Sequence, residues 1–382
     1  MKLLISGGGT GGHVYPALTV AQAMLNPVRM GTTLPTLTPS DLLWIGSRGE
    51  IEEDLVRRAG LEFIGLPAGG LRGMGLVTKV RNAAWILSSV GPARRIINQF
   101  RPDVVLVTGG YACVSVTVAA WLQRVPVLVY LPDIVPGLAV RFLSRFAARI
   151  AVTSEESYHF FRREKVVVTG YPVRPSTYAL DRVQARHSLD LDPEEATLLV
   201  FGGSRGARSI NRALVAGLRQ LLPVCQILHI SGRLDADWVS GAARNLPEEL
   251  SQRYHHFVYM HDMPLALAAA DLAVARAGAA TLGEFPAVGL PAVLVPYPYS
   301  GQHQGPNAEY MEQNGAARVL PDAELEEKLV PTVLDLLEDE ETLANMRESA
   351  RAMARPDAAE VIAEQLWLLA RQRTASDTGA PS

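Results

Sequence analysis

The chain has 382 residues, of which 48% are hydrophobic and 20% are charged, the composition of a globular protein long enough for two domains with separate cores. Its net charge of −3 conceals an asymmetry, because residues 1–170 carry 18 Lys+Arg against 11 Asp+Glu and the other residues carry 18 against 28. No apolar run reaches the roughly 18 residues of a spanning helix, and the first residues turn to glycine too early for a signal peptide. We therefore expect a cytosolic protein with a basic first half.

The cysteines and histidines do not form a metal-binding pattern. Cys113 and Cys225 both lie in apolar stretches, so we expect reduced core residues. His255, His256 and His261 fall close together, but no HxxxH, HExxH or CxxC spacing accompanies them. The sequence predicts no bound metal.

The first predicted strand leads directly into a glycine-rich turn. Lys2–Ser6 is apolar enough for a buried strand, Gly7–His13 follows it, and a helix is predicted from Tyr15 to Leu25. Glycines let the backbone approach a ligand, and the N–H groups at a helix start favour anions. The dinucleotide-binding form has an acidic residue about twenty positions later, and residues 27–40 contain none. This counts against an NAD enzyme and leaves His13 either a catalytic or a structural role.

Residues 67–101 form a basic segment with six Lys or Arg residues and no acidic residue. Apolar residues alternate with the basic ones at spacings that fit an amphipathic helix. Such a surface attracts anionic lipid headgroups by about 1 kcal/mol per basic residue near the membrane. The pattern also fits a core helix with a solvated basic face, and the sequence leaves both interpretations open.

Two further strands complete the first half. Pro102–Leu122 predicts a strand, a glycine turn and a helix, and Val125–Tyr130 predicts the next strand. Asp133 is the one carboxylate that follows this strand, which makes it a candidate for acid–base chemistry.

The second half repeats the plan of the first. Thr197–Asn211 again places an apolar strand before a glycine turn, and Gln226–Gly232 predicts a further strand. Between the halves, the polar and proline-rich segment up to His187 has little periodic pattern, so we place a domain boundary nearby. The repeat predicts the α/β class, with two Rossmann-like doubly wound parallel sheets facing each other across a cleft.

The most informative stretch is Ala275–Asn307, which predicts a glycine turn, a short helix through Glu284 and a proline-bounded strand. The helix start faces the crevice at the carboxyl ends of the strands, where a diphosphate binds. Glu284 is suited to accept two hydrogen bonds from a ribose diol, and His303 and Gln304 offer neutral groups for sugar hydroxyls. The spacing fits equally well an interpretation in which Glu284 is a solvated helix residue and His303 and Gln304 belong to a polar loop.

The chain ends in acidic, helical sequence from Asp322 onward. The last long helix is predicted for Asp357–Gln372, and Thr374–Ser382 is predicted to be a disordered tail.

Seven segments resemble, in order, the motifs of the MurG-type family, the UDP-N-acetylglucosamine:lipid-linked muramyl-peptide N-acetylglucosaminyltransferases of cell-wall synthesis. They are GGTGGH (Gly8–His13), GLRGMG (Gly70–Gly75), GGY (Gly109–Tyr111), GYPVRP (Gly170–Pro175), GGSRGA (Gly202–Ala207), FVYMHDM (Phe257–Met263) and Ala275–Asn307. The resemblance implies a GT-B fold. It implies an acceptor- and membrane-side domain at 1–168, a UDP-sugar domain at 169–356, and a final helix at 357–372 that packs back on the first domain.

The resemblance also implies site residues. Those for UDP-N-acetylglucosamine are Thr10, Gly11, Gly12, Arg174, Ser204, Met260, Arg276, Ala279, Thr281, Glu284, His303 and Gln304. Ser204 is expected at a phosphate, the main chain of Met260 at the uracil edge, and Arg174 or Arg276 at the leaving-group charge. The acceptor-side residues are Gly109, Tyr111 and Asn211.

One segment departs from the family pattern. Where the family has a His-Glu-Gln-Asn run, this chain has Tyr130, Leu131, Pro132 and Asp133, so the glutamate is replaced by leucine. His13 has a suitable pKa range to act as the base, and Asp133 is the second candidate. GT-B enzymes as a group lack an acidic metal-binding motif, and none is present in this sequence.

The reaction that the resemblance implies is inverting transfer of N-acetylglucosamine to the 4-hydroxyl of undecaprenyl-pyrophosphoryl-MurNAc-pentapeptide, which converts lipid I to lipid II for peptidoglycan synthesis, cell shape and division. The expected partners are UDP-GlcNAc, the lipid-linked acceptor and the cytoplasmic face of the cell membrane, with no cofactor and no nucleic acid. Three alternatives stay open: a transferase for diacylglycerol or another lipid, an enzyme like UDP-GlcNAc 2-epimerase, and an inactive nucleotide-sugar-binding protein.

Overall fold

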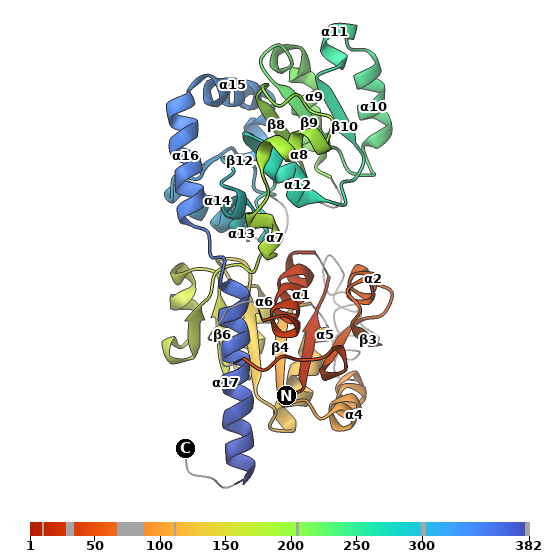
Figure 1. Cartoon of the computed structure of the whole chain (residues 1–382), viewed down its shortest axis with the longest axis vertical. Coiled ribbons are helices and arrows are strands. Elements are labelled where there is room, and N and C mark those ends of the chain that lie inside the picture. The colour runs from red at the N-terminus through yellow and green to blue at the C-terminus, as the bar shows by residue number, and fades with distance from the viewer. Residues whose placement is uncertain are drawn as a thin grey trace. The chain divides into compact units, whose positions relative to one another are not determined.

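The computed structural model describes residues 1–9, 11–27, 34–66, 88–110, 112–203, 206–298 and 303–378, with side chains through residue 375. The chain forms two compact units (Figure 1). The first contains Met1–Val173 and Asp357–Ser382, and the second contains Arg174–Pro356. Most of the basic segment 67–101, including GLRGMG, lies outside the described residues.

The first unit contains a seven-stranded parallel sheet in the order β3-β2-β1-β4-β5-β6-β7. The strands are β1 (Leu3–Gly7), β2 (Leu42–Ser47), β3 (Glu62–Leu66), β4 (Val104–Gly109), β5 (Val127–Leu131), β6 (Arg149–Val152) and β7 (Val166–Val168). Four of them are continuous apolar runs with every residue buried, namely β1, β2, β4 and β5, as expected for strands covered on both faces. The strand order reverses between β1 and β4, which is where open α/β sheets bind ligands.

Helices of the first unit flank this sheet. They are α1 (Gly11–Leu25), α2 (Ile51–Arg58), α4 (Val90–Phe100), α5 (Ala112–Leu122), α6 (Leu138–Leu143) and α17 (Ala358–Thr378), with short 3-10 turns η1 (Pro39–Asp41), η2 (Glu155–Phe160) and η3 (Arg163–Lys165). The helix expected from Tyr15 begins four residues earlier, at Gly11, directly after the glycine turn. This brings the glycine turn and the helix start together.

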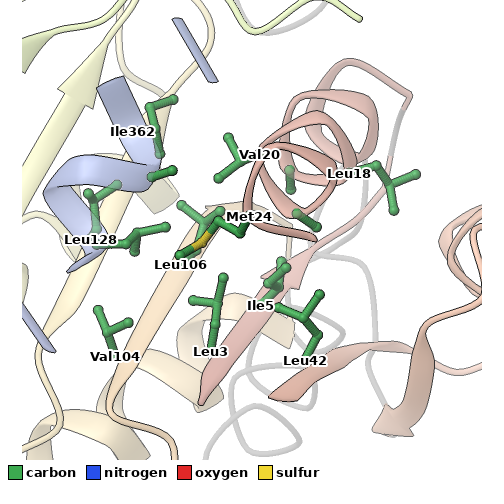
Figure 2. Close-up of a cluster of buried hydrophobic side chains, with 14 of the residues drawn as sticks. Leu3, Ile5, Leu18, Val20, Met24, Leu42, Val104, Leu106, Leu128 and Ile362 are labelled. Carbon is green, nitrogen blue, oxygen red and sulfur yellow. The ribbon is translucent and has the colours of Figure 1, made fainter. Parts of the chain in front are cut away.

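The carboxyl-terminal helix α17 belongs to the core of the first unit. Figure 2 shows Ile362 of α17 in the same apolar cluster as Val20 and Met24 of α1 and Leu106 of β4. Ile362 is fully buried, and Arg373 donates to the carbonyl of Pro102 at 2.6 Å. Helix α17 therefore completes a hydrophobic layer on the sheet.

Helix α17 also corrects the expectation of a disordered tail from Thr374. The helix runs on through Thr378, because neither glycine nor proline interrupts the chain before Gly379. The hydroxyl of Thr374 donates to the carbonyl of Ala370 at 3.1 Å. Residues 379–382 lie outside the described part.

The second unit repeats the architecture with six parallel strands in the order β10-β9-β8-β11-β12-β13. The strands are β8 (Thr197–Phe201), β9 (Gln226–Ile230), β10 (Tyr254–Phe257), β11 (Leu272–Ala275), β12 (Ala292–Leu294) and β13 (Ala317–Val319). The helices are α7 (Pro175–Tyr178), α8 (Arg182–Ser188), α9 (Arg208–Leu221), α10 (Ala236–Arg244), α11 (Glu248–Ser251), α12 (Met263–Ala269), α13 (Thr281–Val288), α14 (Gln304–Gln313), α15 (Leu325–Glu338) and α16 (Glu340–Ala352), with the 3-10 turn η4 (Asp322–Glu324). The strand order reverses between β8 and β11.

The segment up to His187, expected as a linker without pattern, forms the short helices α7 and α8. Asp181 begins α8 by accepting from the main-chain N–H of Gln184 at 2.9 Å, a helix cap that operates over three residues and needs no long apolar period. The two units meet in sequence at Val173–Arg174, whereas the expected boundary was 168–169. Among the described residues, no helix is both long enough and apolar enough to cross a membrane.

Candidate active site

The start of α13 in the second unit leaves main-chain donors unused. The N–H groups of Thr281, Leu282 and Gly283 bond to carbonyls one turn back, whereas those of Ala279 and Ala280 make no hydrogen bond to the described residues. The hydroxyl of Thr281 bonds to the carbonyl of Gly278 at 2.7 Å, which fixes the turn. A helix start with free N–H groups beside the switch point of the sheet is a site for an anion such as a diphosphate.

Glu284 lies one turn into α13 and has an unusual environment. Its side chain is half-buried, and it makes no hydrogen bond or ion pair to the described residues. Burial raises the pKa of its carboxyl from 4.5 to about 7, against the opposing effect of the Arg174 charge. A buried acid without a protein partner is a candidate to bind a ligand.

The two arginines expected near phosphate differ in their surroundings. Arg174 is exposed at the start of α7. Arg276, directly after β11, pairs with Asp322 at 2.5 Å, and it donates to the Ser209 hydroxyl at 2.7 Å and to the Val295 carbonyl at 3.2 Å. The structure therefore uses Arg276 to tie β11 to its neighbours and leaves Arg174 with an exposed guanidinium.

Polar residues that follow β12 surround the same edge of the sheet. His303 and Gln304 lie at the start of α14, and the Gln304 side chain accepts from the N–H of Tyr297 at 2.9 Å. The side-chain amide of Asn307, fully buried, donates to the carbonyl of Ala277 at 3.2 Å. Asn307 thereby positions the turn that precedes α13.

Met260 lies in the turn between β10 and α12 and is half-buried. Neither its N–H nor its carbonyl bonds to the described residues. The neighbouring Val258 and Tyr259 are exposed. Among the described residues, nothing occupies the main chain of Met260, so its pairing with the edge of a planar base stays a prediction.

Asn211 corrects an expectation. Its side chain is completely buried. The amide donates to the Ser231 carbonyl and to Asp235, both at 2.9 Å, and its oxygen is 3.0 Å from Nε2 of His229. Burial lowers the pKa of His229 to about 3, which keeps the ring neutral within this network. Asn211 is therefore an internal residue of the second unit, and its side chain is occupied by these protein partners rather than exposed to a ligand.

In the first unit, the glycine turns after β1 and β4 pack against each other. The N–H of Gly8 donates to the carbonyl of Gly109 at 3.0 Å. A Cβ at Gly109, whose φ is +126°, would lie 2.9 Å from the ring of His13, so a side chain there would displace the imidazole. The carbonyl of His13 accepts from the hydroxyl of Thr108 at 2.7 Å. These contacts hold the half-buried His13 on the first turn of α1.

Glu52 supports the first glycine turn, and the sequence analysis missed it. It is fully buried, and its carboxylate accepts from the N–H of Gly9 at 3.2 Å and from that of Ser47 at 3.1 Å. A Cβ on Gly8 would lie 2.2 Å from this carboxylate. Glu52 therefore braces the first glycine turn from below, and Gly8 must be glycine to admit it.

The segment that departs from the family pattern, Tyr130–Asp133, lies at the end of β5. Tyr130 and Leu131 are both fully buried, and Leu131 belongs to the apolar cluster beneath α5 and α6. The Tyr130 hydroxyl lies 3.1 Å from that of Thr153, and burial raises the pKa of the phenol strongly, with a smaller contribution from the charge of Asp133. The leucine thus stands in the core, and the half-buried Asp133 follows two residues later.

Three expected site residues, Thr10, Tyr111 and Ser204, lie outside the described residues. Gly11 and Gly12 are the first residues of α1, and the carbonyl of Gly12 accepts from the hydroxyl of Tyr171 at 3.4 Å. Within the described part of the chain, no group of three His, Cys, Asp or Glu residues is arranged to hold a metal ion.

Two family models match the chain, the glycosyltransferase family 28 N-terminal domain over residues 3–152 and the glycosyltransferase family 28 C-terminal domain over residues 197–362. A protein of Roseiflexus sp. (strain RS-1) is 42% identical over 98% of this chain and 97% of its own length. Its name is UDP-N-acetylglucosamine–N-acetylmuramyl-(pentapeptide) pyrophosphoryl-undecaprenol N-acetylglucosamine transferase.

Solved structures agree with the expected GT-B fold. The crystal structure of Acinetobacter baumannii MurG matches with a TM-score of 0.72 at 25% identity and covers 96% of this chain and 98% of that chain. A UDP-GlcNAc 2-epimerase from Neisseria meningitidis bound to UDP-GlcNAc matches with a TM-score of 0.67 at 14% identity, over 96% and 100% of the chains, and shares the fold alone. The expected family and fold are confirmed: this chain belongs to glycosyltransferase family 28, within the UDP-N-acetylglucosamine–N-acetylmuramyl-(pentapeptide) pyrophosphoryl-undecaprenol N-acetylglucosamine transferases.

Proposed function

We propose that this chain transfers N-acetylglucosamine from UDP-GlcNAc to the 4-hydroxyl of the muramyl sugar of lipid I, with inversion, and so forms lipid II for peptidoglycan synthesis. Membership of the family supports the reaction. The observation in the structure that carries it is Glu284, whose carboxyl has no partner among the described residues, beside the N–H groups of Ala279 and Ala280, which bond to no described residue. This combination suits a ribose next to a diphosphate.

In this proposal the second unit binds the donor. The ionised carboxylate of Glu284 accepts hydrogen bonds from the ribose hydroxyls, and the main chain of Met260 pairs with the uracil edge. The free N–H groups at α13 bind the diphosphate, while His303 and Gln304 contact the sugar. Arg174 is the exposed cation that meets the phosphate charge.

The chemistry needs two further groups. Charge that develops on the UDP leaving group is stabilised by the helix start and Arg174, which is electrostatic catalysis. His13 takes the proton from the attacking hydroxyl, since an imidazole titrates in the physiological range. Asp133 is the second candidate for this step. Inversion follows because the hydroxyl attacks the anomeric carbon from the face opposite to UDP.

A lipid-linked acceptor requires contact with a membrane, and we assign that contact to an apolar patch formed by Trp121, Leu122, Leu138 and Phe142. Trp121 is 53% exposed and Leu138 is 87% exposed. Phe146 joins the two helices of the patch, because its ring lies 5.4 Å from Trp121 and 5.2 Å from Phe142.

Three exposed arginines lie close to the patch residues in the sequence: Arg124, Arg141 and Arg145. Apolar side chains rimmed by cations match the cytoplasmic face of a bilayer, where anionic headgroups lie above the acyl chains. We therefore propose peripheral contact with that face.

Replacing Leu138 by Ser tests the membrane contact. Since a leucine side chain contributes about 1.5–3 kcal/mol when it is buried, capture by sedimenting phosphatidylglycerol vesicles should fall about tenfold. Leu234→Ser is the matched control, because Leu234 is 74% exposed in the second unit. Equal capture of the two variants would exclude the patch.

The reaction itself is tested by the release of UDP from UDP-GlcNAc by the purified protein, with and without a short-chain lipid-linked muramyl-pentapeptide, beside a diacylglycerol competitor. We expect release that depends on the muramyl acceptor. Release without an acceptor would indicate an epimerase-like or hydrolytic enzyme, and release with diacylglycerol alone would indicate a different lipid substrate. Donor binding without release on any acceptor would indicate an inactive nucleotide-sugar-binding protein.

A further inference from the structure

The second unit contains a pocket at the carboxyl end of α13. The helix start that is proposed to bind the donor diphosphate lies at the other end. The volume of the pocket is about 430 Å³, and Val288, the last residue of α13, contributes to its wall. The charged residues of its lining are Asp181, Arg182, Arg347 and Arg351. Helix α13 has eight residues, so the two ends are about 12 Å apart. The volume is within the range of small-molecule sites.

The arginines of this pocket share one carboxylate. Asp271, at the start of β11, lies 2.8 Å from Nη1 of Arg182 and 3.4 Å from Nη2 of Arg347, and it also pairs with the buried Arg186. The same carboxylate accepts from the N–H of Thr197 at 2.9 Å. One negative charge therefore serves three guanidinium groups.

A fourth arginine adds a charge that the protein does not neutralise. The side chain of Arg351 of α16, an exposed residue, makes no hydrogen bond or ion pair to the described residues. The side chain of Arg351 packs against Gly289. A Cβ added to Gly289 would lie 2.6 Å from Cγ and Nε of Arg351. Asp181 also lines the pocket, and its carboxylate caps α8 by accepting from the N–H of Gln184. Three arginines and one aspartate therefore line the pocket itself.

The arginines of the pocket also repel one another. The pKa of Arg182 and that of Arg347 are both lowered, first by burial and then in part by repulsion from the other arginines, despite the attraction of Asp271. Their Nε groups are buried without a hydrogen-bond partner among the described residues. An anion beside them would relieve the repulsion.

We propose that this pocket binds a phosphate-bearing anion through Arg182, Arg347 and Arg351. Guanidinium groups match phosphate oxygens with paired hydrogen bonds, and a phosphate dianion balances the two excess positive charges where a single carboxylate would not. The adjoining cavity does not favour an anion, because its lining sets four acidic residues, Glu194, Glu195, Glu340 and Asp271, against Arg186 and Arg347. The site is distinct from the donor site, which uses the other end of α13.

Calorimetric titration of the full-length protein with inorganic pyrophosphate, in saturating UDP, tests this proposal. UDP keeps the donor site filled, so any heat of binding reports a second site. We expect one pyrophosphate per chain. Arg351→Ala should weaken this binding at least about tenfold, the effect of losing a charge-assisted contact, and leave UDP affinity unchanged. Arg219→Ala is the matched control, because Arg219 is exposed on α9.

Two results would overturn the proposal: no pyrophosphate binding once UDP is bound, or equal binding by wild type and Arg351→Ala. The second would mean that Arg351 only covers the carboxyl end of α13. Sedimentation with phosphatidylglycerol vesicles then identifies the source of the phosphate. If Arg351→Ala also lowers vesicle capture, the ligand is a lipid headgroup; if it lowers pyrophosphate binding alone, the ligand is a soluble phosphate compound.

Discussion

The glycine turn of the first unit and the start of α13 in the second unit have the same strand, turn and helix plan, yet their main-chain donors are used differently. In the first unit, the N–H of Gly9 already bonds to the carboxylate of Glu52. In the second, the N–H groups of Ala279 and Ala280 bond to no described residue, and the carboxyl of Glu284 has no protein partner. The protein therefore satisfies the N–H of Gly9, whereas we propose that a ligand binds those of Ala279 and Ala280.

In the proposed reaction, the second unit binds the donor and the first unit takes the proton from the acceptor. The first unit holds His13, the base in the proposed reaction, beside Gly109. The second unit keeps hydrogen-bonding capacity for the donor. A Rossmann-like turn is therefore no evidence of a phosphate site until its N–H groups are traced to their partners.

The largest effect is expected from His13→Ala. Loss of a general base lowers kcat by about 10²–10⁴-fold, while the KM for UDP-GlcNAc should stay within about twofold, because uniform binding is retained. Steady-state kinetics with a lipid-linked acceptor measures both constants. Turnover close to that of the wild type would exclude His13 as the base, and a raised donor KM would place His13 in donor binding and break the comparison. Asp133→Asn in the same assay tests the second candidate.

Glu52→Gln tests whether the first turn is held by the protein. The amide cannot accept from both Gly9 and Ser47, so the free energy of unfolding should fall by about 1.5–3 kcal/mol, the contribution of hydrogen bonds to a charged group. Urea denaturation measures this loss, and donor KM should not change. Glu53→Gln is the control, since Glu53 is the next residue, is only partly buried and pairs, among the described residues, with Arg57 and the Gly49 N–H. A similar stability for both variants would show that Glu52 does not brace the turn.

A smaller effect is expected from pH. Burial raises the pKa of Glu284 to about 7, and the ionised carboxylate accepts hydrogen bonds from both ribose hydroxyls more strongly than the neutral acid does. UDP affinity should therefore fall as the pH drops from 8 to 6, by up to about tenfold, because the carboxyl becomes protonated over this range. Glu284→Gln removes the titration and should leave only the pH dependence of UDP's own phosphate. Parallel profiles for the two proteins would mean that Glu284 does not bind UDP in its ionised form.

The sequence predicted the parallel-sheet architecture well, because fully buried strands such as Leu3–Gly7 and Val104–Gly109 are continuous apolar runs. It did not identify Glu52. Glu50, Glu53 and Asp54 are equally acidic neighbours in the chain, and only the fold shows that Glu52 alone turns inward.

Side-chain partners set the other limit on the sequence analysis. Asn211 and Arg276 have the residue types of ligand contacts, but long-range partners occupy them: Ser231 and Asp235 for the former, Asp322 for the latter. No local pattern encodes contacts over such separations. The start of α8 depends on a single capping hydrogen bond to Asp181. The continuation of α17 to Thr378 depends on the absence of a helix breaker. Hydrophobic periodicity reports neither feature.

The most direct test of the central claim is a double-mutant cycle between Glu284 and the ribose. The affinities of wild type and Glu284→Ala for UDP and for 2′,3′-dideoxy-UDP are measured by calorimetry at pH 8, where the carboxylate is mostly ionised. We predict that the wild type binds UDP about 10- to 100-fold more tightly than the dideoxy analogue, as expected for hydrogen bonds to a charged group, and that Glu284→Ala loses this preference. An undiminished preference in Glu284→Ala would contradict the account, because the ribose would then be recognised elsewhere.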